Sequence, residues 1–519
     1  MNSDELVEKL HSIDREYRHL ERAAAALQWD QETYLPPRGV AERAEQLAVL
    51  EGIAHERLTA GETGSLLAAL GSVSENPRGY ESLSALNRDF LRVMRRRFDK
   101  AVKLPVEFVS AAARAEGLSQ AAWVQARRNN DFAAFLPHLQ TMIDFARKKA
   151  EYWGFGSGNS GGDSDGGGSG QSLYDGLLDI YEPGMGAVEI SALFAALRER
   201  LTKLLKQIAS RALPDTSFLT QTFAVEQQAA FNQRLMDYIG FDRERGRLDT
   251  SAHPFTTTLG SDDIRITTRY FPANLLSGLF SVIHETGHAL YEMGFPPELR
   301  GSCLADGASM ALHESQSRFW ENVIGRSRPF LSGIFPMLCD CFPQLAPVSA
   351  DSFYRAVNAV RPSLIRVDAD ELSYSLHIIL RFELEQQLIS GELAPEKLPA
   401  IWREKTKEYF GLESETDADG VLQDIHWSMG SFGYFPSYAL GNLYGLQITG
   451  KLKEDIPELD GLVAAGQFER LYTWLRDTVY CWGCRLEPAE LLYKITGEKL
   501  QAGPFLNYIE GKYSELYGL

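Results

Sequence analysis

Apolar residues recur every three or four positions along most of this chain, the spacing that gathers them on one face of an α-helix. This pattern predicts helices at 40–58, 106–127, 131–152, 187–212, 272–293, 308–325, 371–391 and 465–480. Alternating β-branched residues, the pattern of a strand, are convincing only at 253–270, where Gly260 to Asp263 offers a turn between two short strands. The sequence therefore predicts a mainly α fold with one small β-hairpin.

One segment interrupts the helical pattern. Residues 154–172 read GFGSGNSGGDSDGGGSGQS, and such a Gly/Ser-rich run cannot bury enough apolar surface to offset the entropy of ordering it. It could be a linker between domains, but the helical patterns on both sides favour one continuing domain. We expect a single domain over 1–519 with a flexible surface insertion at 156–170.

Composition and charge exclude several classes of protein. The 519 residues are 44% hydrophobic and carry a net charge of −18, with a sequence pI of about 5.1. Such a surface repels phosphate backbones and anionic lipids, so we expect no nucleic-acid or membrane partner. No apolar run approaches a membrane span, the N-terminus lacks a signal-peptide pattern, and five cysteines make no disulfide framework. We expect a cytoplasmic protein.

The pentapeptide HETGH carries the strongest chemical signal. On a helix, His284 and His288 lie one turn apart on the same face and can bind one ion, while Glu285 can take a proton from a metal-activated water. HExxH also occurs by chance, but the predicted helix, which begins at Pro272, is apolar enough to be buried. Two histidines and a glutamate are costly there unless something coordinates them. The sequence predicts a zinc site, with Co²⁺ or Mn²⁺ as possible substitutes.

A catalytic zinc ion takes three protein ligands and keeps one position open. The metzincin pattern would need a glycine at 291 and a histidine at 294, where this chain has Tyr291 and Gly294. The next helical stretch supplies His313 and Glu314 instead. Glu314 could equally pair on the surface with Arg318, one turn further on. Spacing favours Glu314 over His313 as the third ligand but leaves both open.

Arg366 follows a largely apolar stretch of sequence, and Asp368 and Asp370 come two and four residues after it. A guanidinium at this place could form a structural pair with one of these aspartates. It could also grip the C-terminal carboxylate of a peptide through two parallel hydrogen bonds. The residues themselves leave both interpretations open.

A Gly-rich stretch at 420–442 is unusually dense in polar and aromatic residues, namely Gln423, Asp424, His426, Trp427, Tyr434 and Tyr438. Tyrosine and histidine side chains near a metal can donate hydrogen bonds to an oxyanion. The same residues could form an aromatic core whose hydroxyls are satisfied internally. Neither interpretation is favoured by the chemistry of the residues alone.

The CWGC tetrapeptide, with Cys481 and Cys484, could be a redox pair or half of a zinc site. No βαβ pattern surrounds it, and Cys303, Cys339 and Cys341 offer no matching second C-x-x-C. We therefore expect two core cysteines on one helix turn.

Several motifs, in order along nearly the whole chain, resemble the M32 family of metallocarboxypeptidases. They are WDQETYLPPRG (29–39), YEPGM (181–185), HPF (253–255), DIRIT (263–267), HETGH (284–288), HESQSR (313–318), IRVDAD (365–370) and GVLQDIHW (420–427). The resemblance implies a large, helical, saddle-shaped zincin in which two lobes flank a deep substrate groove. It also implies a homodimer that removes single residues from peptides with a free C-terminus.

The resemblance also implies roles for individual residues. His284, His288 and Glu314 would be the metal ligands and Glu285 the general base. Arg366 would anchor the substrate carboxylate. His426, together with Tyr438 or Tyr434, would stabilise the oxyanion. Arg265 and His253 are further expected substrate-binding residues. Arg265, in the DIRIT motif, is the alternative anchor for the carboxylate. The Gly/Ser-rich insertion departs from the family pattern but leaves these assignments untouched.

Two other functions share parts of this pattern. An endo-acting zinc oligopeptidase of the related helical zincins would have the same metal site but no fixed cation at the end of the groove, so Arg366 argues against it. A non-catalytic peptide-binding protein could lose Glu285 freely, and this chain retains it. A zinc-dependent carboxypeptidase is therefore the function that the sequence favours.

Overall fold

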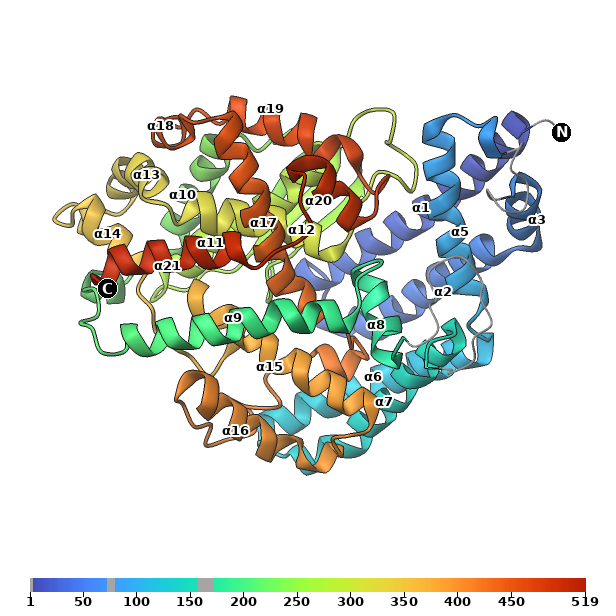
Figure 1. Ribbon diagram of the computed structural model, residues 1–519, viewed down its shortest axis with the longest axis horizontal. Coiled ribbons are helices and arrows are strands. Elements are labelled where there is room, and N and C mark those ends of the chain that lie inside the picture. The colour runs from blue at the N-terminus through green and yellow to red at the C-terminus, as the bar shows by residue number, and fades with distance from the viewer. Residues whose placement is uncertain (1–2, 72–79, 157–170) are drawn as a thin grey trace.

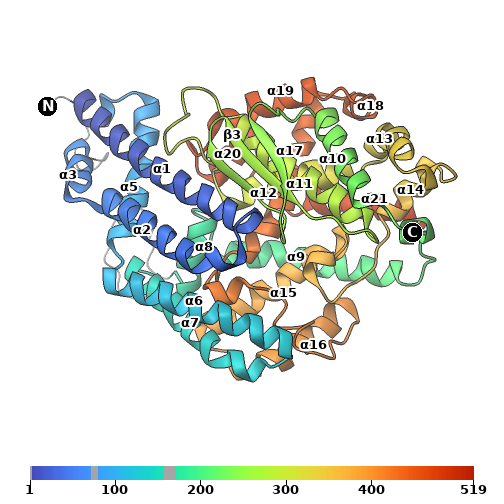
Figure 2. The ribbon, with the colours of Figure 1, turned by 180° about the vertical axis from the view of Figure 1, so that it is seen from behind.

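The computed structural model describes residues 3–71, 80–156 and 171–519. Up to residue 239, the described part of the chain forms helices and their connections (Figures 1 and 2). They are α1 (Ser3–Thr33), α2 (Val40–Thr59), α3 (Gly61–Leu70), α5 (Ala85–Val102), α6 (Val106–Asn129), α7 (Phe132–Trp153), α8 (Leu173–Tyr181), α9 (Ala187–Ile208) and α10 (Val225–Ile239). Helices α1 and α2 pack along each other, and Figure 2 shows them crossing one side of the molecule.

A three-stranded sheet follows, with β1 (Gly246–Thr250), β2 (Thr256–Gly260) and β3 (Asp263–Thr268) in the order β1-β3-β2. Strands β2 and β3 are antiparallel, which confirms the predicted hairpin, whereas the parallel strand β1 was not predicted. Ile264 and Ile266 of β3 pack against Val282 and Ala289 of α11 (Leu275–Met293) in a small apolar cluster. The sheet therefore lies directly beside the helix that carries HETGH.

Helix α11 begins later than the sequence predicted. The predicted start at Pro272 is wrong, because the chain first turns back on itself through a bridge between Phe271 and Asn274. The Asn274 side chain then accepts a hydrogen bond from the Ser277 backbone N–H, which caps the helix. The first helical residue is consequently Leu275.

The remaining chain is again helical, and short 3₁₀ turns join several of its helices. These helices are α12 (Met310–Arg318), α13 (Arg328–Cys341), α14 (Ala350–Val357), α15 (Glu371–Ser390), α16 (Leu398–Phe410), α17 (Phe435–Asp455), α18 (Leu459–Ala464), α19 (Glu469–Thr478), α20 (Pro488–Thr496) and α21 (Gly503–Tyr517). The predicted helix at 308–325 is α12 followed by a π-helical segment, Phe319–Gly325. The other predicted helices are confirmed with shifted ends.

The core is a continuous cluster of buried apolar side chains that reaches from Val7 in α1 to Tyr517 in α21. Helices α15 and α17 are buried on nearly every side, which explains why their apolar residues show little preference for one face. Within the described ranges, no helix combines the length and the apolar character needed to cross a membrane.

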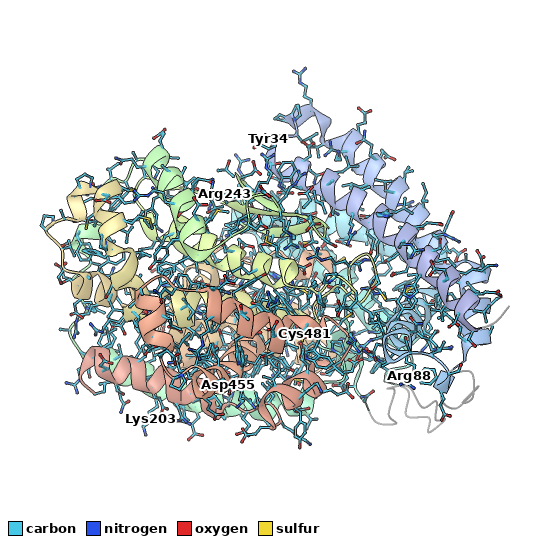
Figure 3. The ribbon with its side chains drawn as sticks, turned by 90° about the horizontal axis from the view of Figure 1, so that it is seen from above. Tyr34, Arg88, Lys203, Arg243, Asp455 and Cys481 are labelled. Atoms are coloured by element: carbon cyan, nitrogen blue, oxygen red, sulfur yellow. The ribbon has the colours of Figure 1, made fainter. Side chains whose placement is uncertain are left out.

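The two cysteines of CWGC do not share a helix turn, so that prediction is wrong. A 3₁₀ turn at Tyr480–Trp482 contains Cys481, which lies near the middle of the face in Figure 3. It ends at Gly483, whose φ of +49° is rarely adopted by other residues. Cys484 lies beyond this turn, where its thiol donates to the Cys303 carbonyl at 3.0 Å. Both thiols are free.

The predicted insertion at 156–170 lies outside the described residues except for Gly156. Its flanks meet, since the Gly156 backbone N–H donates to the Gln171 carbonyl at 3.2 Å. Helices α7 and α8, which precede and follow this segment, pack against each other.

We predict that replacing residues 157–170 by a two-residue Asn-Gly turn leaves the fold intact. The flanks already lie together, and the entropy of closing a loop changes slowly with its length. The melting temperature should change by less than about 4 °C, with unchanged kcat, as measured by calorimetry and a peptidase assay. A larger drop would show that the replaced residues pack on the rest of the protein.

Candidate active site

Helices α11 and α12 bring three possible metal ligands together. Glu314 Oε2 lies 3.5 Å from His288 Nε2 and 3.8 Å from His284 Nε2. One ligand atom from each residue lies within 4.8 Å of the others, and among the described residues this is the one such group of three. Ligands around a tetrahedral zinc ion lie about 3.4 Å apart. These three side chains therefore fit a divalent ion of that size with little movement.

Each histidine is oriented by a second hydrogen-bond partner. His284 Nδ1 lies 3.0 Å from Glu321 Oε2, and His288 Nδ1 lies 2.6 Å from His313 Nδ1. His313 Nε2 in turn contacts Glu292 Oε1 at 2.8 Å. Partners of this kind fix the ring and direct the other nitrogen at a metal. His313, the alternative third ligand, thus lies behind His288 rather than beside the ion.

Glu292 and Glu321, the two carboxylates that orient the histidines, were not identified from the sequence. Glu292 lies one helical turn beyond His288, a spacing that could have indicated it. Glu321 follows α12 in the π-helical segment, where its distance along the chain gives no such signal.

The two oxygens of the Glu314 carboxylate have different partners. Its Oε1 accepts from Arg318 Nε at 2.7 Å, while Oε2 faces the histidines. The pair with Arg318, considered above as a surface contact, does form, but Glu314 is buried. Burial by itself would raise the pKa of Glu314, but the Arg318 guanidinium and the two histidines hold it far below its usual range. Glu314 is therefore ionised and available as an anionic ligand.

The side chain of Glu285 is held by the sheet. Thr256 of β2 donates its hydroxyl proton to Glu285 Oε2 at 2.6 Å. Burial raises the pKa of Glu285, against the opposing effect of His284. A carboxyl group whose pKa is raised toward neutrality is well suited to accept and return a proton. Thr256 was not identified from the sequence.

Glycines allow the helices to approach closely enough to form this site. A Cβ atom at Gly287 in HETGH would lie 2.8 Å from the Gln316 carbonyl oxygen of α12. A Cβ atom at Gly441 in α17 would lie 2.8 Å from Glu314 Cγ. Helix α12 therefore lies between α11 and α17 at distances that only residues without a side chain permit.

Arg366 pairs with an aspartate that local sequence did not suggest. Its Nε donates to Asp424 Oδ1 at 2.9 Å and its Nη1 to the Tyr374 hydroxyl at 3.2 Å. The considered pairs with Asp368 or Asp370 are wrong. Asp368 is exposed, and Asp370 accepts from backbone N–H groups at the start of α15.

The three residues expected to stabilise the oxyanion lie around Arg366. His426 Nε2 lies 3.2 Å from the Tyr438 hydroxyl, and the Tyr438 ring centroid lies 5.1 Å from the Arg366 guanidinium. The Tyr434 and Tyr438 rings are 5.2 Å apart. Burial, aided by the Glu314 carboxylate, raises the pKa of Tyr434 to about 12, so the hydroxyl keeps its proton. Burial and then Arg366 lower the pKa of His426 to about 3, so the ring is neutral.

The other two expected substrate-binding residues, Arg265 and His253, lie in the sheet and in one of its loops. Arg265 directs Nε and Nη2 at the carboxylate of Asp263, at 2.8 and 2.9 Å, and its guanidinium lies 4.3 Å from the Trp29 ring centroid. His253 is exposed in the loop between β1 and β2. The Nε and Nη2 groups of Arg265 are thus bound to Asp263, two residues before it on β3.

Two histidines one turn apart, a carboxylate from the following helix and a buried glutamate beside them define a metallopeptidase of the HExxH class. The model of the family described as "Carboxypeptidase Taq (M32) metallopeptidase" matches residues 9–513, and the chain belongs to that family. The resemblance seen in the motifs is confirmed, and the chain is a metallocarboxypeptidase that releases residues from peptide C-termini.

Similar proteins match over their full length. The chain is 42% identical to "Thermostable carboxypeptidase 1" of Thermus thermophilus over 100% of both chains, and 37% identical to "Carboxypeptidase 1" of Bacillus subtilis over 98% of this chain and 99% of that one. Its structure matches the M32 carboxypeptidase of Deinococcus radiodurans R1 with a TM-score of 0.93 and 39% identity, covering 99% and 100% of the two chains.

We predict that Gly287→Ala weakens metal binding. The new methyl group would meet the backbone of α12 and push Glu314 away from the histidines, so the affinity for zinc should fall by at least about tenfold. Isothermal titration of the metal-free protein measures this affinity. Gly117→Ala is the control, because a Cβ atom there meets nothing within 4 Å. Equal affinities in the two variants would contradict the proposed role of the close contact.

Proposed function

We propose that His284, His288 and Glu314 hold a zinc ion and that Glu285 is the general base of peptide hydrolysis. The observation that carries this proposal is the position of Glu314 Oε2, 3.5 and 3.8 Å from two imidazole nitrogens. A bound zinc ion would supply Lewis-acid polarisation of the scissile carbonyl and a water of lowered pKa. Glu285 takes the proton of the attacking water and passes it to the leaving amine. Co²⁺ or Mn²⁺ could use the same ligands.

We further propose that Arg366 anchors the C-terminal carboxylate of the substrate. Its Nε edge is occupied by Asp424, and among the described residues Nη2 makes no hydrogen bond. The end of the guanidinium formed by Nη1 and Nη2 can therefore donate two hydrogen bonds to a carboxylate. Arg265 instead gives its Nε and Nη2 to the Asp263 carboxylate and lies over the Trp29 ring. The anchor explains why the enzyme cuts only the last peptide bond.

Tyr434, Tyr438 and His426 are the proposed donors to the developing oxyanion. The Glu314 carboxylate adds to the effect of burial in raising the pKa of Tyr434. The Nδ1 atom of His426 is buried and makes no hydrogen bond among the described residues. Neutral histidine and protonated tyrosine can donate without adding a charge, which suits a site that must release a carboxylate product.

Three broader expectations complete the proposal. We propose one peptidase domain whose two lobes flank the substrate groove, in keeping with the continuous apolar core. We also propose a homodimer, which rests on the family resemblance. A reducing cytoplasmic location is in keeping with five free cysteines.

The metal assignment predicts opposite results for two neighbouring substitutions. His288→Ala should lose metal and activity together, because two remaining ligands hold zinc poorly. Glu285→Gln should retain metal while turnover falls by at least about 10²-fold, because the base is lost and the ligands are not. Metal analysis and steady-state kinetics on both variants measure this. Full metal occupancy in His288→Ala would contradict the role of His288 as a ligand. Metal loss in Glu285→Gln would show that Glu285 is a ligand or a structural residue.

The anchor assignment predicts the effect of amidating the substrate. Arg366→Ala should lose about 2–4 kcal/mol of transition-state binding, and Arg366→Lys less, because lysine keeps the charge without the fork. A C-terminal amide should be a poor substrate for the unmodified enzyme, and its penalty should shrink in Arg366→Ala.

The measurement is kcat/KM for one peptide as free acid and as amide. Arg265→Ala is the matched control and should keep the full amidation penalty. The anchor role would pass to Arg265 if its variant, rather than Arg366→Ala, lost the discrimination between acid and amide.

A further inference from the structure

Glu385 of α15 is completely buried and joins three separate segments. Its Oε1 accepts from the indole Nε1 of Trp427 at 2.8 Å. Its Oε2 accepts from the Tyr174 hydroxyl of α8 at 2.7 Å and from the Gly433 backbone N–H at 2.9 Å. One carboxylate thus receives three hydrogen bonds from residues up to 211 positions away in the chain.

Two of these donors are the immediate neighbours of proposed oxyanion residues. Trp427 follows His426, and Gly433 precedes Tyr434, so Glu385 holds the stretch 427–433 at both ends. Gly433 has a φ of +86°, and a Cβ atom there would lie 2.8 Å from the Leu177 carbonyl oxygen of α8. The turn is therefore pressed against α8 and has little freedom to move.

Helix α8 supports the same site from its other end. Tyr181, the first residue of the YEPGM motif, contacts Tyr434 edge to face with ring centroids 4.9 Å apart. Tyr174, near the start of α8, binds Glu385. This helix and Glu385 consequently define the position of Tyr434 from two directions.

A buried carboxylate destabilises a fold unless its lone pairs are matched, and an apolar side chain of similar volume is often equally stable. Burial raises the pKa of Glu385 to about 7, against the effect of Tyr174 and the other donors. Its three donors come from the segments that must be aligned with the metal ligands. The Glu385 carboxylate thus ties these segments together through hydrogen bonds that an apolar side chain could not make.

We propose that Glu385 is a positioning residue for peptide hydrolysis, which fixes His426 and Tyr434 where the oxyanion develops. This inference rests on the roles proposed above for those two residues. Removing one oxyanion donor typically costs about 10²–10³-fold in kcat, and misplacing two donors should cost a similar or smaller factor.

Glu385→Gln tests the proposal. A glutamine has one acceptor oxygen, so its NH₂ group must face either the indole N–H or the Gly433 N–H, and one bond is lost in each orientation. We expect kcat to fall by about 10–100-fold, with KM within about twofold and full metal content. Glu383→Gln on the same helix is the matched control, because Glu383 binds Arg198, Lys405 and Tyr409 instead. It should leave kcat within about twofold.

Non-additivity distinguishes positioning from general destabilisation. In a His426→Ala, Tyr434→Phe background, Glu385→Gln should lower kcat by less than about threefold further, because the donors it positions are already absent. Equal losses in both backgrounds would overturn the proposal. So would an unchanged kcat in Glu385→Gln.

Three further single variants complete the test. Tyr174→Phe removes one donor without altering the carboxylate and should lower kcat by about 3–10-fold at unchanged KM. If Glu385→Gln does not fold, full kcat in Tyr174→Phe overturns the proposal. The single variants His426→Ala and Tyr434→Phe test the underlying assignment separately. Full turnover in both would refute the oxyanion roles themselves, whereas a loss there with none in Glu385→Gln would refute only the positioning role.

Discussion

The shared carboxylate of Glu314 is the interaction on which the site depends. One oxygen binds the Arg318 guanidinium and the other faces His284 and His288. This arrangement requires α12 to lie within backbone contact of α11, which Gly287 permits. The glycine in HETGH is consequently part of the site, although it contributes no ligand atom.

A chain of contacts links the proposed metal ligands to the proposed carboxylate anchor. The Arg318 guanidinium lies 4.3 Å from the ring centroid of Tyr374, whose hydroxyl accepts from Arg366 Nη1. Asp424 then joins Arg366 to Arg381, with one carboxylate oxygen for each arginine. Two buried arginines thus share one carboxylate, which leaves one positive charge to be matched by the proposed substrate carboxylate. The spacing between the proposed metal ligands and the proposed anchor is therefore fixed by packed side chains.

Local periodicity predicted the parts of this fold that depend on short-range geometry. His284 and His288 share a face because a helix brings residues four apart together, and the β2–β3 hairpin follows from its turn. The partners of Arg366 and His284 could not be predicted this way, because Asp424 and Glu321 lie 58 and 37 positions distant. The wrong pairing of Arg366 with Asp368 or Asp370 arose from preferring near neighbours. Spacing favoured Glu314 over His313 without excluding either, and the family resemblance indicated Glu314 and the oxyanion residues.

X-ray absorption spectroscopy of the zinc-loaded protein tests the metal assignment most directly. The proposed ligands predict two imidazole nitrogens and one carboxylate oxygen at about 2.0–2.2 Å, with a light atom in the remaining position. Glu314→Gln should weaken the carboxylate contribution and leave the imidazole scattering in place. A third imidazole in the unmodified protein would identify His313 as a ligand and contradict the site described above. An unchanged spectrum in Glu314→Gln would also contradict it.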